Sequence, residues 1–457
     1  MTMIGFETIG NATLIAYDDQ PILATDPWLN GDAYFGSWGL SHAIPPEQRE
    51  SIRRCRYHWL SHAHPDHLHM DSLAELSHAE FLLAQHVGQR MERDLRELGF
   101  RVRILPEREW VPLSPHLRVM TMANHNQDSV LLLDLNGRLV LNLNDTGDLG
   151  WGRFIRAIAQ QYRESYFLNL VGWSDADMMN FYNEDGQKIP HPGAIKSPIG
   201  WRLQDFAIKY RARKIIPFSS FHQFQREDSM WGNEFVPDLP AYYVGRQPHK
   251  PEILPPFLRV DCERDDIQEL TPPANPLIVR FPAEFGDHWA DPLAQEEEQQ
   301  LVRYIQAKEK LKDHLGFVRF RVGGKETTID LERRKFARGI TFEVPRQSLL
   351  TAIQYEVFDD LLIGNFMKTT LHGIPSLYPY FCPIVPKYAD NGRAQSNAEL
   401  RQYFWHYVRR DVTGHLLTTF ENRAVRLFQT SIPENSGVYR ATKKLYWRVK
   451  SSYKKKE

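Results

Sequence analysis

The sequence has few cysteines and no long hydrophobic run. Its three cysteines, Cys55, Cys262 and Cys382, lie far apart, which excludes a disulfide framework or a cysteine-ligated cluster and suits a reducing compartment. No apolar run reaches the roughly 18 residues that a membrane-spanning helix needs. The first residues lack the basic and apolar regions of a signal peptide, so we expect a cytoplasmic protein.

The chain also lacks a strong excess of charge. Its formal net charge is −1 over 457 residues, which argues against nucleic acid as a partner. Hydrophobic residues make up 42% and charged residues 25%, the balance of a globular protein. The length exceeds that of one typical domain, so we expect a main domain with a smaller addition.

One short stretch, residues 57–67, says most about function. An apolar run ends there in the pattern His-x-His-x-Asp-His, formed by His62, His64, Asp66 and His67. On a turn that leaves a strand, this spacing allows His62 and His64 to bind a first metal ion and Asp66 and His67 to bind a second. Two neighbouring ions can hold one hydroxide, a strong nucleophile at neutral pH. A solvated histidine-rich loop is the alternative, but four potential ligands in this order favour a metal site.

This motif resembles the signature of the metallo-β-lactamase superfamily. The resemblance implies an α/β fold, an αββα sandwich of two face-to-face sheets with helices outside and metals at one end. It also implies His125 as a ligand of the first ion, Asp145 as a bridging carboxylate and His222 as a ligand of the second ion. Asp148 is the alternative to Asp145, and each of these residues can instead belong to an ordinary loop. Asp66 and Asp145 are the candidate catalytic residues.

Two features near the N-terminus are expected at the rim of this site. Asp26 follows an apolar strand and can accept a hydrogen bond from a metal-binding histidine, or it can simply initiate a turn. The loop that follows carries Tyr34, Phe35 and Trp38. These aromatic side chains can wall a pocket over the site, or they can pack in the core.

Three further stretches narrow the resemblance to the cytidine-monophosphate-N-acetylneuraminate hydroxylase branch. They are residues 168–181, residues 216–221, and residues 340–345 followed by 358–366. That branch carries an N-terminal Rieske domain with an iron–sulfur cluster, which the three scattered cysteines of this chain cannot supply. We therefore expect the electron-delivery module to be absent or to reside on another protein, which counts against oxygen chemistry.

Composition predicts four segments along the chain. We expect the sandwich over residues 1–245, a Pro-rich linker over 246–276, an α+β accessory domain over 277–440 and a basic tail over 441–457. The accessory domain can bind substrate or another subunit, including a second copy of the chain, or only cover apolar surface. The tail can contact an anionic membrane surface or a partner, or it can be a solvated tail.

Three functions agree with these residues. We favour a dinuclear metal hydrolase that acts on an ester or phosphoester of a small molecule, with zinc as the first choice of metal and iron or manganese as alternatives. The second is an iron-dependent oxygenase like the sialate hydroxylase, with a separate electron donor. The third is a non-catalytic binding protein, which the complete ligand set disfavours. Fold-level analogy does not choose the substrate.

Overall fold

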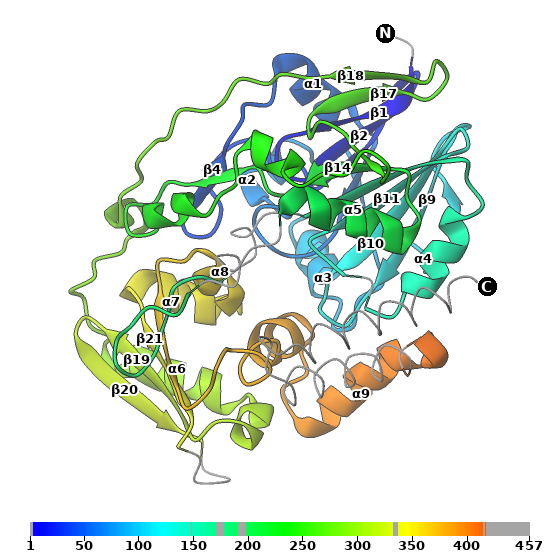
Figure 1. Ribbon diagram of the computed structural model, residues 1–457. Helices are drawn as coiled ribbons and strands as arrows, with labels where there is room; N and C mark the ends of the chain where they lie inside the picture. The colour runs from blue at the N-terminus through cyan, green and yellow to red at the C-terminus, as the bar shows by residue number, and fades with distance from the viewer. Residues whose placement is uncertain are drawn as a thin grey trace, which may run out of the picture.

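The computed structural model describes residues 3–147, 149–170, 178–190, 198–331, 337–414 and 416. These residues form two bodies, a large sandwich and a smaller α+β body (Figure 1). The candidate Asp148, the basic tail over 441–457 and part of the stretch 168–181 lie outside the described residues.

An eight-stranded sheet forms one half of the sandwich, in the order β18-β17-β1-β2-β3-β5-β6-β7. Its strands are β1 (Ile4–Ile9), β2 (Thr13–Asp18), β3 (Gln20–Thr25), β5 (Tyr57–Leu60), β6 (Glu80–Leu83), β7 (Arg101–Ile104), β17 (Leu258–Asp261) and β18 (Asp266–Glu269). The strands β3, β5, β6 and β7 run parallel. Because β3 and β5 end at the same edge, Asp26 and the motif that begins at Ser61 lie side by side.

A seven-stranded sheet forms the other half, in the order β16-β14-β12-β11-β10-β9-β8. Its strands are β8 (Val111–Pro112), β9 (Leu117–Ala123), β10 (Ser129–Leu135), β11 (Arg138–Asn144), β12 (Glu164–Leu170), β14 (Lys214–Phe218) and β16 (Glu252–Ile253). Asn136 and Gly137 turn the β10–β11 hairpin with φ of 50° and 80°, as an Asn-Gly turn predicts.

Apolar side chains fill the space between the two sheets. Buried residues from both sheets form one cluster, among them Phe6, Trp59, Leu131 and Tyr166. The rings of Phe6 and Tyr166 meet edge to face across the sandwich, with centroids 5.1 Å apart. Each fully buried side chain of this kind contributes about 1.5–3 kcal/mol to folding, so the alternation of apolar residues along the strands accounts for the two-sheet core.

Helices cover the outer faces of the sandwich. The helix α1 (Pro46–Arg54) packs against β3, α3 (Arg90–Glu97) against β7, and α5 (Ile199–Tyr210) against β14, with α4 (Gly152–Ala159) beside α5 (Figure 1). This arrangement is the αββα sandwich that the sequence predicts.

The Pro-rich stretch over 246–276 is more than a linker. Its strand β16 extends the second sheet beside β14, and β17 pairs with β1 in the first sheet. The strands of the sandwich therefore continue to Glu269 and do not end at residue 245. The prolines lie before, between and after these short strands, outside the strands themselves, where no ladder hydrogen bond needs a backbone donor, so they conceal the strands in the sequence.

The smaller body has a sheet and a core of its own, and we call it the C-terminal domain. Its sheet has the order β13-β22-β21-β19-β20. The strands are β13 (Phe181–Tyr182), β19 (Phe317–Val322), β20 (Lys325–Asp330), β21 (Gly339–Glu343) and β22 (Lys368–His372), and the helices are α6 (Gln295–Gln306), α7 (Arg346–Gln354), α8 (Phe358–Ile363), the π-helical η6 (Ile384–Asn391) and α9 (Asn397–Val408). Phe320, Phe342, Phe358 and Phe381 lie in its core.

Short elements complete the described chain. They are β4 (Trp38–Leu40), α2 (Met70–Ala74), β15 (His222–Phe224) and the 3-10 helices η2 (Met230–Glu234), η3 (Leu239–Tyr243), η4 (Pro282–Phe285) and η5 (Glu309–Asp313). The strands β4 and β15 pair with each other, which joins the aromatic loop to the segment that carries His222. Within the described residues, no helix has the length and apolar character that crossing a membrane requires.

The strand β5 carries a fully buried histidine, His58, whose ring nitrogens have no hydrogen-bond partner among the described residues. Burial, aided by the charge of His78, lowers the pKa of His58 from 6.5 to about 3. As the pH falls, His58 therefore takes up a proton at a higher pH in the unfolded chain than in the folded protein. The stabilising contribution of neutral His58 is present above about pH 6.5 and is lost on acidification.

We expect His58→Leu to reduce the pH dependence of stability. Between pH 7 and pH 5, His58 should lower the free energy of unfolding of the wild type by about 2 kcal/mol, and the variant should lose that much less. Urea unfolding of both proteins at the two pH values measures the difference. An equal loss in both proteins would show that His58 is not the proton-linked group.

Candidate metal centre

The first ligand group lies where β5 ends at the edge of the sandwich. The Nε2 atom of His62 is 2.8 Å from Nδ1 of His64 and 3.9 Å from Oδ2 of Asp145. One ligand atom from each of these three residues lies within 4.8 Å of the others. This spacing allows the three side chains to bind one metal ion.

A second ligand group shares Asp145 with the first. The Nε2 atom of His67 is 3.1 Å from Oδ2 of Asp66 and 3.2 Å from Oδ2 of Asp145, and the three residues form another group with metal-binding spacing. The two groups together contain five of the predicted ligands, namely His62, His64, Asp66, His67 and Asp145. Asp145 therefore lies where a bridging carboxylate must lie.

The other two predicted ligands lie outside these groups. The ring of His222 is 1% exposed and stacks on Trp38 at 3.4 Å, and within the described part of the chain neither of its nitrogens has a hydrogen-bond partner. Burial lowers the pKa of His222 to about 3, which keeps it in the neutral form that binds metals. The ring of His125 lies near Phe404 and Tyr407 of α9, at 6.1 and 6.5 Å. Metal binding by His222 and His125 stays a prediction.

Each histidine of the two groups has one ring nitrogen held by a neighbouring side chain. The Oδ2 atom of Asp26 is 3.1 Å from Nδ1 of His67, which confirms the contact predicted for Asp26. The hydroxyl of Ser61 is 2.8 Å from Nδ1 of His62, and Oδ2 of Asp359 is 2.9 Å from Nε2 of His64. In each ring, the other nitrogen faces the ligand cluster, which is the usual arrangement for a metal-binding histidine.

Hydrogen bonds also fix the two carboxylates of the cluster. Asn11 donates from Nδ2 to Oδ2 of Asp66 at 2.9 Å, and the Tyr34 hydroxyl donates to Oδ1 of Asp66 at 2.5 Å. The Ser219 hydroxyl donates to Oδ1 of Asp145, which leaves Oδ2 of Asp145 for both groups. The aromatic loop therefore borders the site as expected, and Tyr34 touches a ligand directly.

Three residues that support the site have left-handed backbones. Asp26, Asn144 and Ser219 follow or end strands with φ of 40°, 50° and 57°, a region that residues other than glycine seldom adopt. Asn144 donates from Nδ2 to Oδ2 of Asp26 at 2.6 Å. Such strain often accumulates at functional sites. The roles of Asn144 and Ser219 were not predicted from the sequence, although each is a polar residue at the end of an apolar strand, the same signal that pointed to Asp26.

The charge of the cluster fits divalent cations. Within the described part of the chain, the only ion-pair partners of Asp66 and Asp145 are histidines. Burial lowers the pKa of His67, but the carboxylates of Asp66, Asp145 and Asp26 raise it more, to well above its usual value. Buried carboxylates need positive charge nearby. Because oxygen and imidazole donors suit zinc, iron and manganese, these residues fit a dinuclear metal site.

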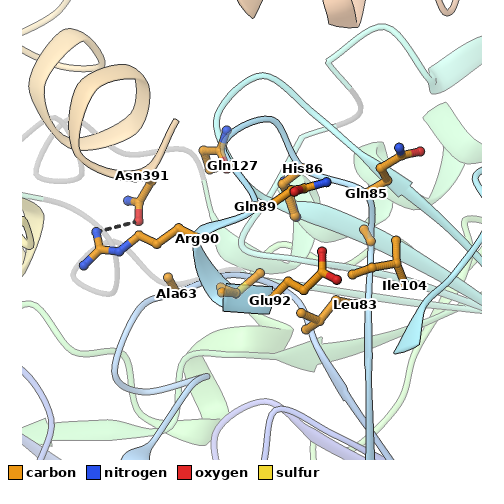
Figure 2. Close-up of a pocket in the computed structure, with 12 residues that line it drawn as sticks. Ala63, Leu83, Gln85, His86, Gln89, Arg90, Glu92, Ile104, Gln127 and Asn391 are labelled. Atoms are coloured by element: carbon orange, nitrogen blue, oxygen red, sulfur yellow. Dashed lines mark hydrogen bonds between the residues drawn. The ribbon is translucent and has the colours of Figure 1, made fainter. Parts of the chain in front are cut away.

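A pocket beside the motif is lined by residues of both domains (Figure 2). Ala63, His86, Arg90 and Gln127 come from the sandwich, and Asn391 comes from η6 of the C-terminal domain. Arg90 donates from Nη1 to Oδ1 of Asn391 at 3.1 Å. His86 is largely buried, and no described residue forms a hydrogen bond with either of its ring nitrogens. The candidate metal centre therefore lies at the boundary between the two domains.

The sandwich has the αββα arrangement predicted from the sequence, and it carries at its edge a ligand cluster that fits a dinuclear metal site. No family model matches the chain. The chain is similar to cytidine monophosphate-N-acetylneuraminic acid hydroxylase of Asterias rubens, with 28% identity over 142 residues, which cover 29% of this chain and 22% of that protein. The Sus scrofa hydroxylase is 27% identical over 144 residues, which cover 29% of this chain and 33% of that protein. The chain thus matches a third or less of the length of these relatives, and the predicted resemblance is confirmed.

The chain is also similar to two solved structures. A metallo hydrolase from Ignicoccus hospitalis has 13% identity and a TM-score of 0.35, over 59% of this chain and 100% of that one. The diiron beta-hydroxylase CmlA from Streptomyces venezuelae has 14% identity and a TM-score of 0.35, over 56% of this chain and 54% of that one.

Proposed function

We propose that this chain is a dinuclear metal-dependent hydrolase that cleaves an ester or phosphoester of a small molecule. The proposal rests on Asp145, whose carboxylate belongs to both ligand groups. Its side chain is 11% exposed, against 0–9% for the other four ligands, so a substrate would approach over Asp145. Two divalent ions held here would supply a hydroxide nucleophile and would polarise the carbonyl or phosphoryl oxygen bonded to the atom under attack.

The residues of the chain would hold the reacting groups in place. Ser61 and Asp26 orient two of the histidine rings, while Asn11 and Tyr34 fix Asp66. The stacked pair of Trp38 and His222 is buried, and the Trp38 ring also packs against Tyr34 with centroids 4.6 Å apart. Fixed ligands of this kind reduce the reorganisation that a reaction requires.

Hydrolysis by the metal-loaded protein is the test of this function. Zinc-loaded protein should hydrolyse bis(4-nitrophenyl) phosphate or 4-nitrophenyl acetate. Removal of the metal with EDTA should lower the rate by roughly 1,000-fold, because a metal ion supplies several kcal/mol of transition-state stabilisation. Added zinc should restore the rate. Activity that survives EDTA, or no activity with zinc, iron or manganese, would contradict the proposal.

An iron-dependent oxygenase is the second candidate, and the similarity to the sialate hydroxylases favours it. In this case, a separate protein would deliver electrons, and the ligand set would hold iron, which imidazole and carboxylate accept as readily as zinc. Iron-loaded protein would then consume oxygen when a chemical reductant and a CMP-sialic acid are present, and the product would gain one oxygen atom. No oxygen uptake under these conditions would count against the oxygenase.

A further inference from the structure

Each of the three histidines has a side chain that contacts the ring nitrogen facing away from the ligand cluster. For His64, this side chain comes from a different domain from those that contact His62 and His67. Ser61 and Asp26, which hold His62 and His67, belong to the sandwich, but Asp359 lies on α8 of the C-terminal domain. We propose that the C-terminal domain completes the metal centre by orienting His64 through Asp359, with Lys387 holding Asp359 in place. This inference rests on the metal centre proposed above.

The geometry at His64 specifies what Asp359 does. The Oδ2 atom of Asp359 is 2.9 Å from Nε2 of His64, and Nδ1 of the same ring is 2.8 Å from Nε2 of His62. A carboxylate at Nε2 holds a proton on that nitrogen, so the lone pair of Nδ1 points towards the ligand cluster. Asp359 is therefore a positioning residue that selects one tautomer and one ring orientation of His64.

Lys387 places a positive charge at the same oxygen of this carboxylate. Its Nζ atom is 3.0 Å from Oδ2 of Asp359 and also 3.0 Å from Nε2 of His64. The side chains of Lys387 and Asp359 are 14% and 4% exposed, so this ion pair is poorly solvated. An ammonium group can only donate hydrogen bonds. Nε2 of His64 cannot both accept from this ammonium and donate to Asp359, so we assign the hydrogen bond of Lys387 to Asp359 and a proton to Nε2 of His64, which leaves the Nδ1 lone pair for the ligand cluster.

The second oxygen of Asp359 supports a role beyond domain packing. Its Oδ1 atom is buried and has no hydrogen-bond partner among the residues that the structure describes, which is costly for a carboxylate. A carboxylate that only joined two domains would be expected to use both oxygens. Here the three groups meet at Oδ2 alone, next to a residue of the metal-binding motif.

Other contacts hold α8 and η6 in position against the sandwich. Arg90 of α3 donates from Nη1 to the carbonyl of Glu356, just before α8, at 2.7 Å, and to Oδ1 of Asn391 at 3.1 Å (Figure 2). The hydroxyl of Ser37 donates to the carbonyl of Gly364, just after α8, at 2.6 Å. Because both ends of α8 are anchored, the position of Asp359 relative to His64 is defined by the docking of the two domains.

Metal affinity measured with Co²⁺ tests this role without an activity assay. Full-length Asp359→Ala should bind Co²⁺ roughly 10- to 100-fold more weakly than the wild type, as for other outer partners of metal-binding histidines, and its visible bands should change. Asp359→Asn keeps the size of the side chain and an acceptor oxygen, so it should restore part of the affinity. If Asp359→Ala fails to fold, the affinity of Asp359→Asn decides in its place.

A matched control separates this role from general destabilisation of the domain. Asp390, on η6, is a second buried carboxylate of the C-terminal domain, and it is paired with Lys308 at 3.1 Å. Asp390→Asn should therefore leave the Co²⁺ affinity unchanged, even where it lowers the unfolding midpoint of the metal-free protein. Wild-type affinity and spectrum in both Asp359 variants would overturn the inference. A wild type that binds no Co²⁺ would instead overturn the proposed metal centre.

Discussion

Replacing Asp145 by asparagine is expected to remove metal binding at both ligand groups. Its Oδ2 atom faces Nε2 of His67 at 3.2 Å and Nε2 of His62 at 3.9 Å, and among the described residues no other side chain belongs to both groups. An amide lacks the negative charge that two adjacent cations require. We expect Asp145→Asn to retain less than about a tenth of the wild-type metal content and to lose hydrolysis by roughly 1,000-fold.

The fold of Asp145→Asn should be retained. Asp145 lies in a turn after β11, outside the inter-sheet core, and an amide still accepts the hydrogen bond from Ser219. Elemental analysis gives the metal content, and circular dichroism gives the fold. The matched control is Asp185→Asn, which changes an exposed turn residue and should leave both unchanged. Full metal content in Asp145→Asn would refute the shared-ligand assignment.

Replacing Arg226 by methionine is expected to be the most destabilising of the substitutions considered. Arg226 is fully buried and donates to Oδ2 of Asp287, also fully buried, at 2.8 Å. It also donates to the carbonyl of Phe35 at 2.9 Å, and its guanidinium lies over the Phe366 ring at 4.0 Å. Methionine keeps most of the volume but leaves Asp287 without a cation. The loss of a buried ion-pair partner typically costs about 3–5 kcal/mol.

Urea unfolding followed by tryptophan fluorescence measures this loss. The control is Arg264→Met, because the Arg264 side chain is 80% exposed and lies 3.7 Å from Asp261. Exposed ion pairs of this kind contribute little, so that variant should stay within about 0.5 kcal/mol of the wild type. A loss below about 1 kcal/mol in Arg226→Met, by the scale of buried ion pairs, would mean that Arg226 does not hold the two domains together.

Much of the fold could be predicted because its signals are local. Alternating apolar residues marked the strands of the sandwich, and Asn136-Gly137 and Gly323-Gly324 marked hairpins that the structure contains. The strands β16 and β17 were missed because they are short and lie between prolines. Their place in the sheets depends on pairing with β14 and β1, partners that no local pattern identifies.

The candidate site was likewise predictable only where its signals in the sequence are local. Four ligands lie within His62–His67, and their spacing alone was enough to predict that they converge. The role of Asp26 followed from its place at the end of an apolar strand. Asp359 and Lys387 are 295 and 323 residues away from His64. Their contribution could not be predicted because it depends on how two domains with separate cores dock.

The most direct test of the dinuclear centre is the metal content of protein purified without added metal. Elemental analysis should be combined with absorption spectra recorded in air and after reduction. We predict two divalent ions per chain. Two zinc ions without visible bands would support the hydrolase, and two iron ions with redox-sensitive bands would favour the oxygenase. Protein that contains no stoichiometric metal, and that binds none when zinc, iron or manganese is supplied, would contradict the account.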